Sequence, residues 1–248
     1  MKKIWVAILC TVPLVSYDQP DTLNLGFNNI LEGGPIRPTG GFYWYQYLEF
    51  YNTHNFLDNR GKPLGNQKSP LFNTFFGCSE FIYQSYTKPI LNARAGIDVQ
   101  IYYAFYSKMQ NNNLGLSSSG GGISDPYIGL FLQWEPIMKG DRELLVHRFE
   151  LGTSYPAGKF KRGYSFNPGN GCYYINPNWA ATFFLNRKLS ISTQLNYVWS
   201  SEKKYTCVQP GQSIFLNYSV ECETLKNFWV SVCGYYLQHW SFYRTRQS

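Results

Sequence analysis

Apolar and polar residues alternate along residues 188–200, KLSISTQLNYVWS. One face of this segment is apolar and ends in Tyr197 and Trp199. The opposite face is polar and carries Ser190, Ser192, Gln194 and Asn196. A period of two predicts a β-strand with two different faces. Because Tyr and Trp are enriched where a membrane meets water, the pattern indicates that the apolar face contacts lipid and the polar face lines a lumen.

The same alternation recurs along the chain, clearly at 96–103, 127–134 and 213–222 and with more noise at 42–51. About ten residues of alternating character is the length of a strand that crosses a bilayer at a tilt. We therefore predict strands at 42–51, 78–86, 93–105, 125–134, 144–155, 177–184, 189–199, 211–222 and 228–238.

The connections between these strands alternate in length. The first, third, fifth and seventh are long and rich in Gly, Asn, Pro and Ser, whereas the others are short. Long extracellular loops and short periplasmic turns are typical of an outer-membrane barrel, and a soluble sandwich has no reason to keep its long loops at one end. We predict an all-β fold, an antiparallel up-and-down transmembrane β-barrel, because a lipid-exposed sheet must close to pair its edges.

Composition supports this prediction. Aromatic residues make up 19% of the 248 residues and charged residues only 15%, an aromatic excess that a soluble core does not need. After the N-terminus no segment approaches the 18 consecutive apolar residues of a spanning helix. The net charge of +7 is scattered, and its densest group is Lys159, Lys161 and Arg162. This dispersal argues against nucleic acid as a partner and favours lipid headgroups and lipopolysaccharide.

We predict three segments in the chain. Residues 1–16, MKKIWVAILCTVPLVS, have the basic start, apolar centre and small final residue of a signal peptide, although a buried N-terminal strand is the alternative. Residues 17–40 lack alternation and form either a periplasmic tether or a plug that folds into the lumen. Residues 41–248 form the barrel, placed in the outer membrane of a Gram-negative cell after export.

Motifs for enzymatic chemistry are missing from the sequence. The three histidines, His54, His147 and His239, lie in no HExxH pattern, and there is no GxSxG motif. The six cysteines contain no CxxC pair, and the GGG at 120–122 lacks the flanking strand and helix of a nucleotide site, so we interpret it as a loop. We therefore expect no catalytic residues, no metal and no cofactor, with a His/Ser/Asn membrane enzyme as the remaining alternative.

Polar side chains on the inward faces are the candidate functional residues. They are Glu49, Asp98, Gln100, Arg148, Glu150, Gln194, Asn196, Asn217 and Glu221. Charges at membrane depth are tolerated when they face the lumen and pair there. These side chains either form a network that fills and rigidifies a small barrel, or line a solute route in which the inward tyrosines of 42–51 supply an apolar wall.

Several ordered motifs resemble those of the outer-membrane family named for the MetA pathway of phenol degradation. They are SDPYIGLFLQWEPIM (124–138), HRFELGTSYPAGKF (147–160), NPG (167–169), NPNWAATFF (176–184), LNYVWS (195–200), QPGQSIFLNYS (209–219) and GYYLQ (234–238). The resemblance runs from about Leu23 to Gln238. It implies a barrel of about twelve strands, inserted by the barrel-assembly machinery and associated with uptake of aromatic or other hydrophobic compounds.

The C-terminal end departs from this family, which continues beyond GYYLQ with further strands that end on an aromatic residue. The present chain ends HWSFYRTRQS after nine predicted strands, an odd count for a barrel with both ends in the periplasm. We therefore expect a C-terminally truncated barrel that does not close by itself and is degraded or aggregates in the periplasm.

Two functions remain open at this point. The first is a passive channel for small hydrophobic or aromatic solutes, which follows from the polar lumen and the resemblance. The second is a structural or surface-interaction protein without conduction, whose long loops contact lipopolysaccharide through basic segments such as GKFKR, residues 158–162.

Overall fold

A computed structural model describes Gly33, Arg60, Lys62 and residues 40–53, 72–111, 116–205, 209–225 and 228–240, with the side chains of 110 and 111 left out. One antiparallel sheet contains all the long strands, in the spatial order β1-β2-β3-β6-β8-β9-β10-β11-β12. These strands are β1 (Gly41–Thr53), β2 (Phe72–Gln84), β3 (Arg94–Asn111), β6 (Tyr127–Gln133), β8 (Arg142–Ser154), β9 (Tyr174–Phe184), β10 (Leu189–Ser200), β11 (Gln212–Leu225) and β12 (Phe228–Trp240). The short strands β4 (Leu116–Ser117), β5 (Gly122–Ile123) and β7 (Ile137–Lys139) pair at the margins of the sheet.

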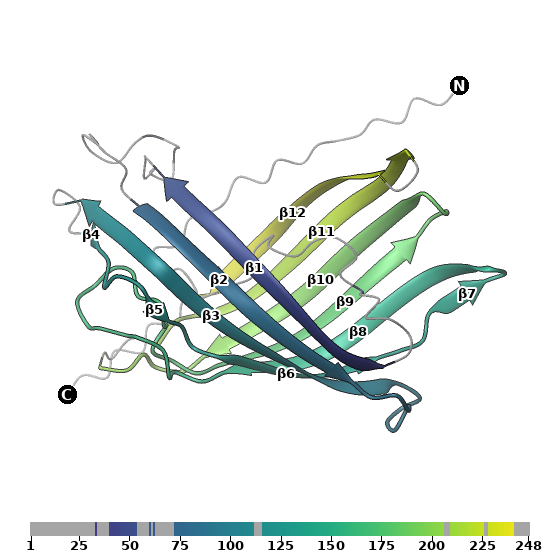
Figure 1. Ribbon diagram of the computed structural model, residues 1–248, viewed down its shortest axis with the longest axis horizontal. Coiled ribbons are helices and arrows are strands. Elements are labelled where there is room, and N and C mark those ends of the chain that lie inside the picture. The colour runs from purple at the N-terminus through teal and green to yellow at the C-terminus, as the bar shows by residue number, and fades with distance from the viewer. Residues whose placement is uncertain are drawn as a thin grey trace.

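The sheet curls into a trough, a half-barrel whose two rims are β1 and β12 (Figure 1). Each long strand pairs with its sequence neighbour, so the order is up-and-down. Among the described residues, no helix has the length and apolar character required to cross a membrane. The predicted all-β antiparallel fold and its nine long strands are confirmed.

Long and short connections alternate as predicted. The long ones follow β1, β3, β8 and β10, and we call that end of the sheet the loop end; the short ones lie at the turn end. The main difference concerns β2, which begins at Phe72 instead of residue 78. Residues 72–77, FNTFFG, do not alternate clearly, but they pair along β1 and β3, with a bulge where Phe75 and Phe76 face Tyr106 and Ala104. Pairing with neighbours therefore decides the start of this strand, since the local pattern does not.

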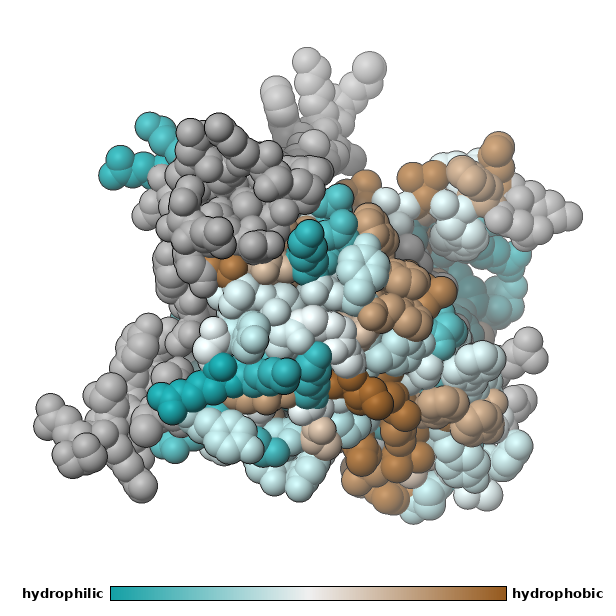
Figure 2. Space-filling view, turned by 60° about the vertical axis from the view of Figure 1, so that its left-hand side comes forward, coloured by the Kyte–Doolittle hydropathy of each residue, from teal (hydrophilic) through white to brown (hydrophobic). Residues whose placement is uncertain are grey.

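The two faces of the sheet are inverted relative to a soluble protein. On β10, Ser190 and Ser192 are fully buried, whereas Ile191 and Leu195 are 37% and 46% exposed. Figure 2 shows brown hydrophobic residues in contiguous areas on the surface. The polar face is therefore the concave inner wall of the trough and the apolar face is the outer wall, the arrangement that suits lipid outside and a polar lumen inside.

Gly33 is the one described residue before Gly40. It lies buried against the inner wall, where its N–H donates to Thr182 Oγ1 at 3.0 Å and its carbonyl accepts from Gln133 Nε2 at 3.3 Å. A Cβ atom at this position would lie 2.2 Å from the Val146 carbonyl oxygen, so the backbone touches the wall directly. The predicted signal peptide and the remainder of 17–39 lie outside the described residues, as do His54, Cys10 and Cys207.

Candidate functional site: the inner wall of the half-barrel

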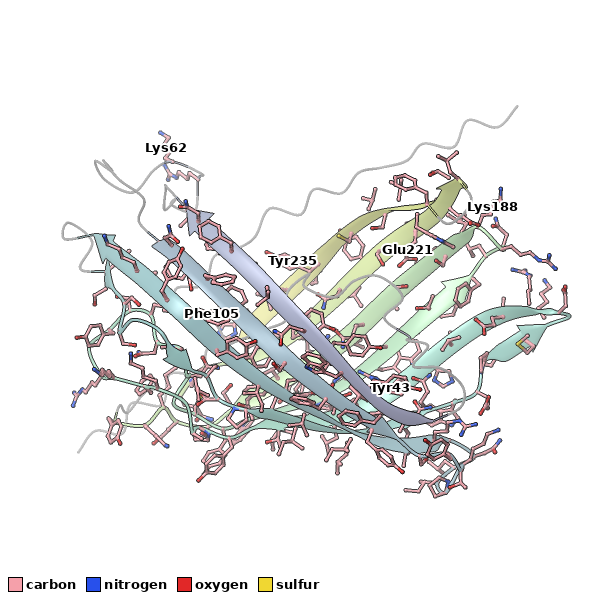
Figure 3. All side chains as sticks on the ribbon, in the orientation of Figure 1. Tyr43, Lys62, Phe105, Lys188, Glu221 and Tyr235 are labelled. Atoms are coloured by element: carbon pink, nitrogen blue, oxygen red, sulfur yellow. The ribbon has the colours of Figure 1, made fainter. Side chains whose placement is uncertain are left out.

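All nine residues predicted to line the lumen lie on the inner wall. Glu150, Asn196, Asn217, Glu221 and Asp98 are buried, and Glu49, Gln100, Arg148 and Gln194 are partly exposed. They come from five strands, β1, β3, β8, β10 and β11, and Figure 3 shows how side chains project from both sides of the ribbon, with Glu221 labelled on β11. Asp98, Gln100, Arg148 and Glu150 lie together on β3 and β8, Gln194, Asn196, Asn217 and Glu221 lie together on β10 and β11, and Glu49 lies on β1 outside both groups.

Three carboxyl groups form what we call the acidic row: Glu80, Asp98 and Glu150, on β2, β3 and β8. Gln100 Nε2 donates to Glu80 Oε1 at 3.0 Å and to Asp98 Oδ2 at 2.9 Å. The Tyr47 hydroxyl donates to Glu80 Oε2 at 2.8 Å. Asp98 is 1% exposed, and its Oδ1 accepts no hydrogen bond. The row is therefore held by neutral donors on one side and keeps an unused acceptor.

Arg148 supplies the positive charge of the acidic row. Its Nη2 lies 3.1 Å from Glu150 Oε2, and its guanidinium lies over the ring of Phe131, 4.9 Å from the centroid. The Tyr127 hydroxyl donates to the other oxygen of Glu150. The inner wall thus already holds one cation between an aromatic face and a carboxylate, a favourable combination in a site shielded from water.

Sequence analysis did not identify Glu80, Tyr47 or Tyr127 as site residues. Glu80 is the only charged residue in the stretch FGCSEFIYQ, where an acid can be tolerated only on the inward face. That isolation was the available signal. The inward tyrosines of β1 were expected to form an apolar wall, but Tyr47 instead bonds Glu80 and Tyr43 packs against Ile82 and Phe131.

Inward glycines let these side chains lie flat against the sheet. A Cβ atom at Gly96 would lie 2.1 Å from Phe131 Cζ, and one at Gly129 would lie 2.5 Å from Glu150 Oε1. A Cβ atom at Gly152 would lie 1.9 Å from the Tyr127 hydroxyl oxygen. Because the glycines have no side chain, the ring and the carboxylate occupy the space directly above the backbone. These contacts fix the acidic row in place.

An aromatic band lies next to the acidic row, toward the loop end. Its buried members are Tyr127, Tyr174, Val198 and Phe215, with Tyr102 and Leu237 packed against them. The rings of Tyr127 and Tyr174 are stacked with centroids 6.2 Å apart. Tyr127 belongs to both groups, since its ring is in the band and its hydroxyl bonds Glu150.

The amide and hydroxyl group fills the other half of the wall. Gln194 bonds Asn178 at 3.4 Å and accepts from Asn217 at 3.3 Å. Ser190 and Ser219 donate to the two oxygens of Glu221 at 2.7 and 2.6 Å. These side chains satisfy one another, which is what a filling and stiffening network requires.

Two of the long connections are tied together at the loop end. Asp125 is buried and accepts hydrogen bonds from the N–H groups of Gly158 at 2.7 Å and Asn170 at 2.6 Å. Lys159 Nζ donates to the carbonyls of Ser119 and Gly121 at 2.7 and 2.6 Å. The ammonium of Lys159, expected within GKFKR as a surface contact, is therefore used inside the loops. It holds the GGG segment, whose last residue, Gly122, belongs to the short strand β5.

The two histidines within the described ranges, His147 and His239, lie on opposite faces of the sheet. His147 stacks on Trp134 on the outer wall, with ring centroids 4.8 Å apart. His239 Nδ1 lies 2.7 Å from Ser213 Oγ, and Ser213 is fully buried in the inner wall. Within the part of the chain that the structure describes, no cluster of three or more His, Cys, Asp or Glu side chains is arranged to hold a metal ion.

Comparison with known proteins agrees with this geometry. The model of the family described as MetA-pathway of phenol degradation matches residues 65–247. None of the curated proteins compared with the chain matches it significantly. Among solved structures, the chain is similar to an outer membrane channel from Pseudomonas putida F1, with a TM-score of 0.63 and 11% identity over 86% of this chain and 78% of that one. At this identity the likeness establishes the fold.

Proposed function

The chain belongs to the MetA-pathway of phenol degradation family, and from that membership and its inner wall we propose that it is an outer-membrane channel for small aromatic or other hydrophobic solutes. The observation that carries the proposal is the inversion of the two faces: fully buried serines inside and exposed leucine and isoleucine outside. A strand that crosses lipid around a polar lumen needs this inversion.

Two features of the inner wall, and the descriptions of the family and of the structural neighbour, support this solute class. The aromatic band gives an apolar ring a surface to contact, and the acidic row beside it gives a polar substituent a partner. The structural neighbour is described as an outer membrane channel, and the family is named for phenol degradation. Movement of the solute would be passive, down its concentration gradient, because the residues of the wall only bind or exclude a solute.

Liposome swelling tests this proposal. The full chain, exported and folded into outer membrane, is reconstituted and exposed to isosmotic phenol-sized neutral solutes. Swelling faster than in protein-free liposomes is expected. A Phe215→Ala variant should change the rate for aromatic solutes more than for a sugar of similar size, because it removes a ring of the aromatic band.

A structural protein of the outer membrane without conduction is the second candidate. The observation in its favour is the mutually satisfied amide and hydroxyl group, which stiffens one half of the wall. A protein that is folded in liposomes by heat-modifiable migration but admits no solute would support this candidate. Partners on this proposal are outer-membrane lipid and lipopolysaccharide, and the protein is not an enzyme.

A further inference from the structure

The inner wall has more acidic than basic side chains, the reverse of the chain as a whole. The whole chain carries a net charge of +7. Away from the turns, the described residues that point inward include five carboxyl groups and one guanidinium. They are Glu49, Glu80, Asp98, Glu150 and Glu221, and Arg148. The other described Lys and Arg residues lie in loops, in turns or near strand ends.

This separation of charge matters because low-dielectric walls concentrate the field of the groups that line them. The field inside the half-barrel comes from an excess of carboxyl groups, four of which are buried in the wall while Glu49 is partly exposed, whereas the basic residues lie toward the two ends of the strands. Asp98 Oδ1 adds a specific feature, since this buried oxygen accepts no hydrogen bond. A buried acceptor of this kind is best satisfied by a donor from a ligand, and a cationic donor satisfies it most strongly.

Aromatic rings adjoin the same carboxyl groups. Tyr127 contributes its ring to the aromatic band and its hydroxyl to Glu150. Tyr102 packs against the band and bonds Gln100, which in turn donates to Glu80 and Asp98. A molecule with a flat apolar body and a cationic end can therefore place the body on the band and the cation beside Asp98.

Arg148 is a built-in example of such a contact. Its guanidinium lies 4.9 Å from the centroid of Phe131 and its Nη2 lies 3.1 Å from Glu150. The wall thus combines an aromatic face and a carboxylate around one cation that belongs to the chain. Asp98 is linked to Tyr102 through Gln100, and Glu150 of the same acidic row bonds Tyr127. Asp98 therefore offers similar chemistry, but no cation is bonded to its Oδ1.

We propose that the acidic row and the aromatic band select organic cations with an aromatic body, such as protonated arylalkylamines, over neutral and anionic molecules of the same size. This inference rests on the proposed channel function and names its preferred solute class. No covalent step is involved. The cation exchanges part of its hydration for the carboxylates and the ring faces as it passes the row.

The test uses three solutes of one shape: benzylammonium, benzyl alcohol and benzoate. Uptake into liposomes that hold the folded full chain is measured for each, and the reversal potential under a benzylammonium chloride gradient gives the ratio of cation to anion permeability. The expected order is benzylammonium, then benzyl alcohol, then benzoate, with a cation preference of about tenfold, the effect of roughly 1.4 kcal/mol.

Matched variants assign the preference to the acidic row. Asp98→Asn keeps the shape and should lower the cation preference by about three- to tenfold. Glu49→Gln removes a charge from the partly exposed wall of β1, where the strand tolerates it, and should lower the preference by a smaller factor. Glu202→Gln removes a carboxylate from an exposed loop and should leave the preference unchanged.

The outcomes separate this inference from the channel function. Equal uptake of all three solutes, or a preference that survives both Asp98→Asn and Glu49→Gln, overturns the cation inference and leaves the channel in place. No uptake of any solute by folded protein overturns both. Heat-modifiable migration of each variant confirms that the protein compared is folded.

Discussion

Tyr103 on β3 lies flat across Gly77 on β2, directly opposite it in the sheet. A Cβ atom on Gly77 would lie 2.8 Å from Cε2 of the tyrosine ring. The Tyr103 hydroxyl accepts from Gln46 Nε2 at 2.7 Å, so one ring spans three strands on the outer wall. Tyr218 has a similar relationship to Gly234 between β11 and β12, where a Cβ atom would lie 2.7 Å from the hydroxyl oxygen.

The first prediction concerns this pair. Gly77→Val places methyl groups where the Tyr103 ring lies, and because neither backbone can move away within the sheet, folding should be destabilised by about 1–3 kcal/mol. Tyr83→Val is the matched control, since it lies on the same strand and face but is 47% exposed. Urea unfolding followed by heat-modifiable migration measures both. Equal midpoints for the two variants would show that the ring does not depend on the glycine.

A second prediction tests the orientation of the two faces. Gln194 pairs with Asn217 and the next residue, Leu195, pairs with Leu216, so two adjacent pairs project to opposite sides. Leu195→Arg puts a charge on the lipid face near mid-strand and should cost about 2–4 kcal/mol and block insertion. Gln194→Ala removes a hydrogen-bonding side chain from the inner wall and should have a mild effect. Similar insertion of both variants would contradict a lipid-facing outer wall.

A third prediction concerns the loop end. Asp125→Asn replaces a carboxylate that accepts from Gly158 and Asn170 with an amide that accepts through one oxygen. Loss of a charged hydrogen bond costs about 1.5–3 kcal/mol, and the cost should fall on the loops and not on the sheet. Hydrogen exchange should therefore quicken in 155–173 and stay unchanged in β10. Glu202→Gln is the control, and exchange that quickens equally in β10 would mean that Asp125 supports the sheet.

Much of this fold was predictable because the alternation of apolar and polar residues follows directly from a strand that faces lipid on one side and a polar lumen on the other. Ser190 and Ile191 fall on opposite faces whatever the strand pairs with, and the alternation of loop lengths gives the up-and-down order. The start of β2 was not predictable, because FNTFFG carries no clear period and its pairing partners are distant in sequence. The local sequence pattern determines on which face of the sheet a residue lies, whereas pairing with distant strands determines where a strand begins.

The inner wall was predictable in part for the same reason. The side of the strand to which each residue projects was enough to identify Asp98 and Glu150. The grouping of Glu80 with them depends on the register of β1, β2 and β3. The flat packing of Phe131 over Gly96 and the internal use of Lys159 are contacts between residues far apart in the chain. A single sequence contains no period that reports such contacts.

The last prediction concerns Gly33 and the inner wall. Its N–H donates to Thr182 Oγ1 at 3.0 Å, and Thr182 Oγ1 also lies 3.0 Å from Ser192 Oγ. Thr182→Val keeps the shape of the side chain and removes the acceptor for Gly33. This variant loses the hydrogen bond that holds Gly33 against the inner wall, which is worth about 1 kcal/mol. We expect solute uptake to rise about fivefold in liposome swelling, because Gly33 is then held less tightly inside the trough.

Ser192→Ala is the control for this experiment, because it removes the partner of Thr182 on β10 and leaves the acceptor for Gly33 in place. Uptake by Ser192→Ala should match that of the unaltered chain. Faster uptake by Thr182→Val alone would favour the plug over the tether as the role of residues 17–40, since only a segment inside the lumen can hinder a solute there. Identical uptake by both variants would favour the tether, because the contact of Gly33 with the wall would then have no effect on passage.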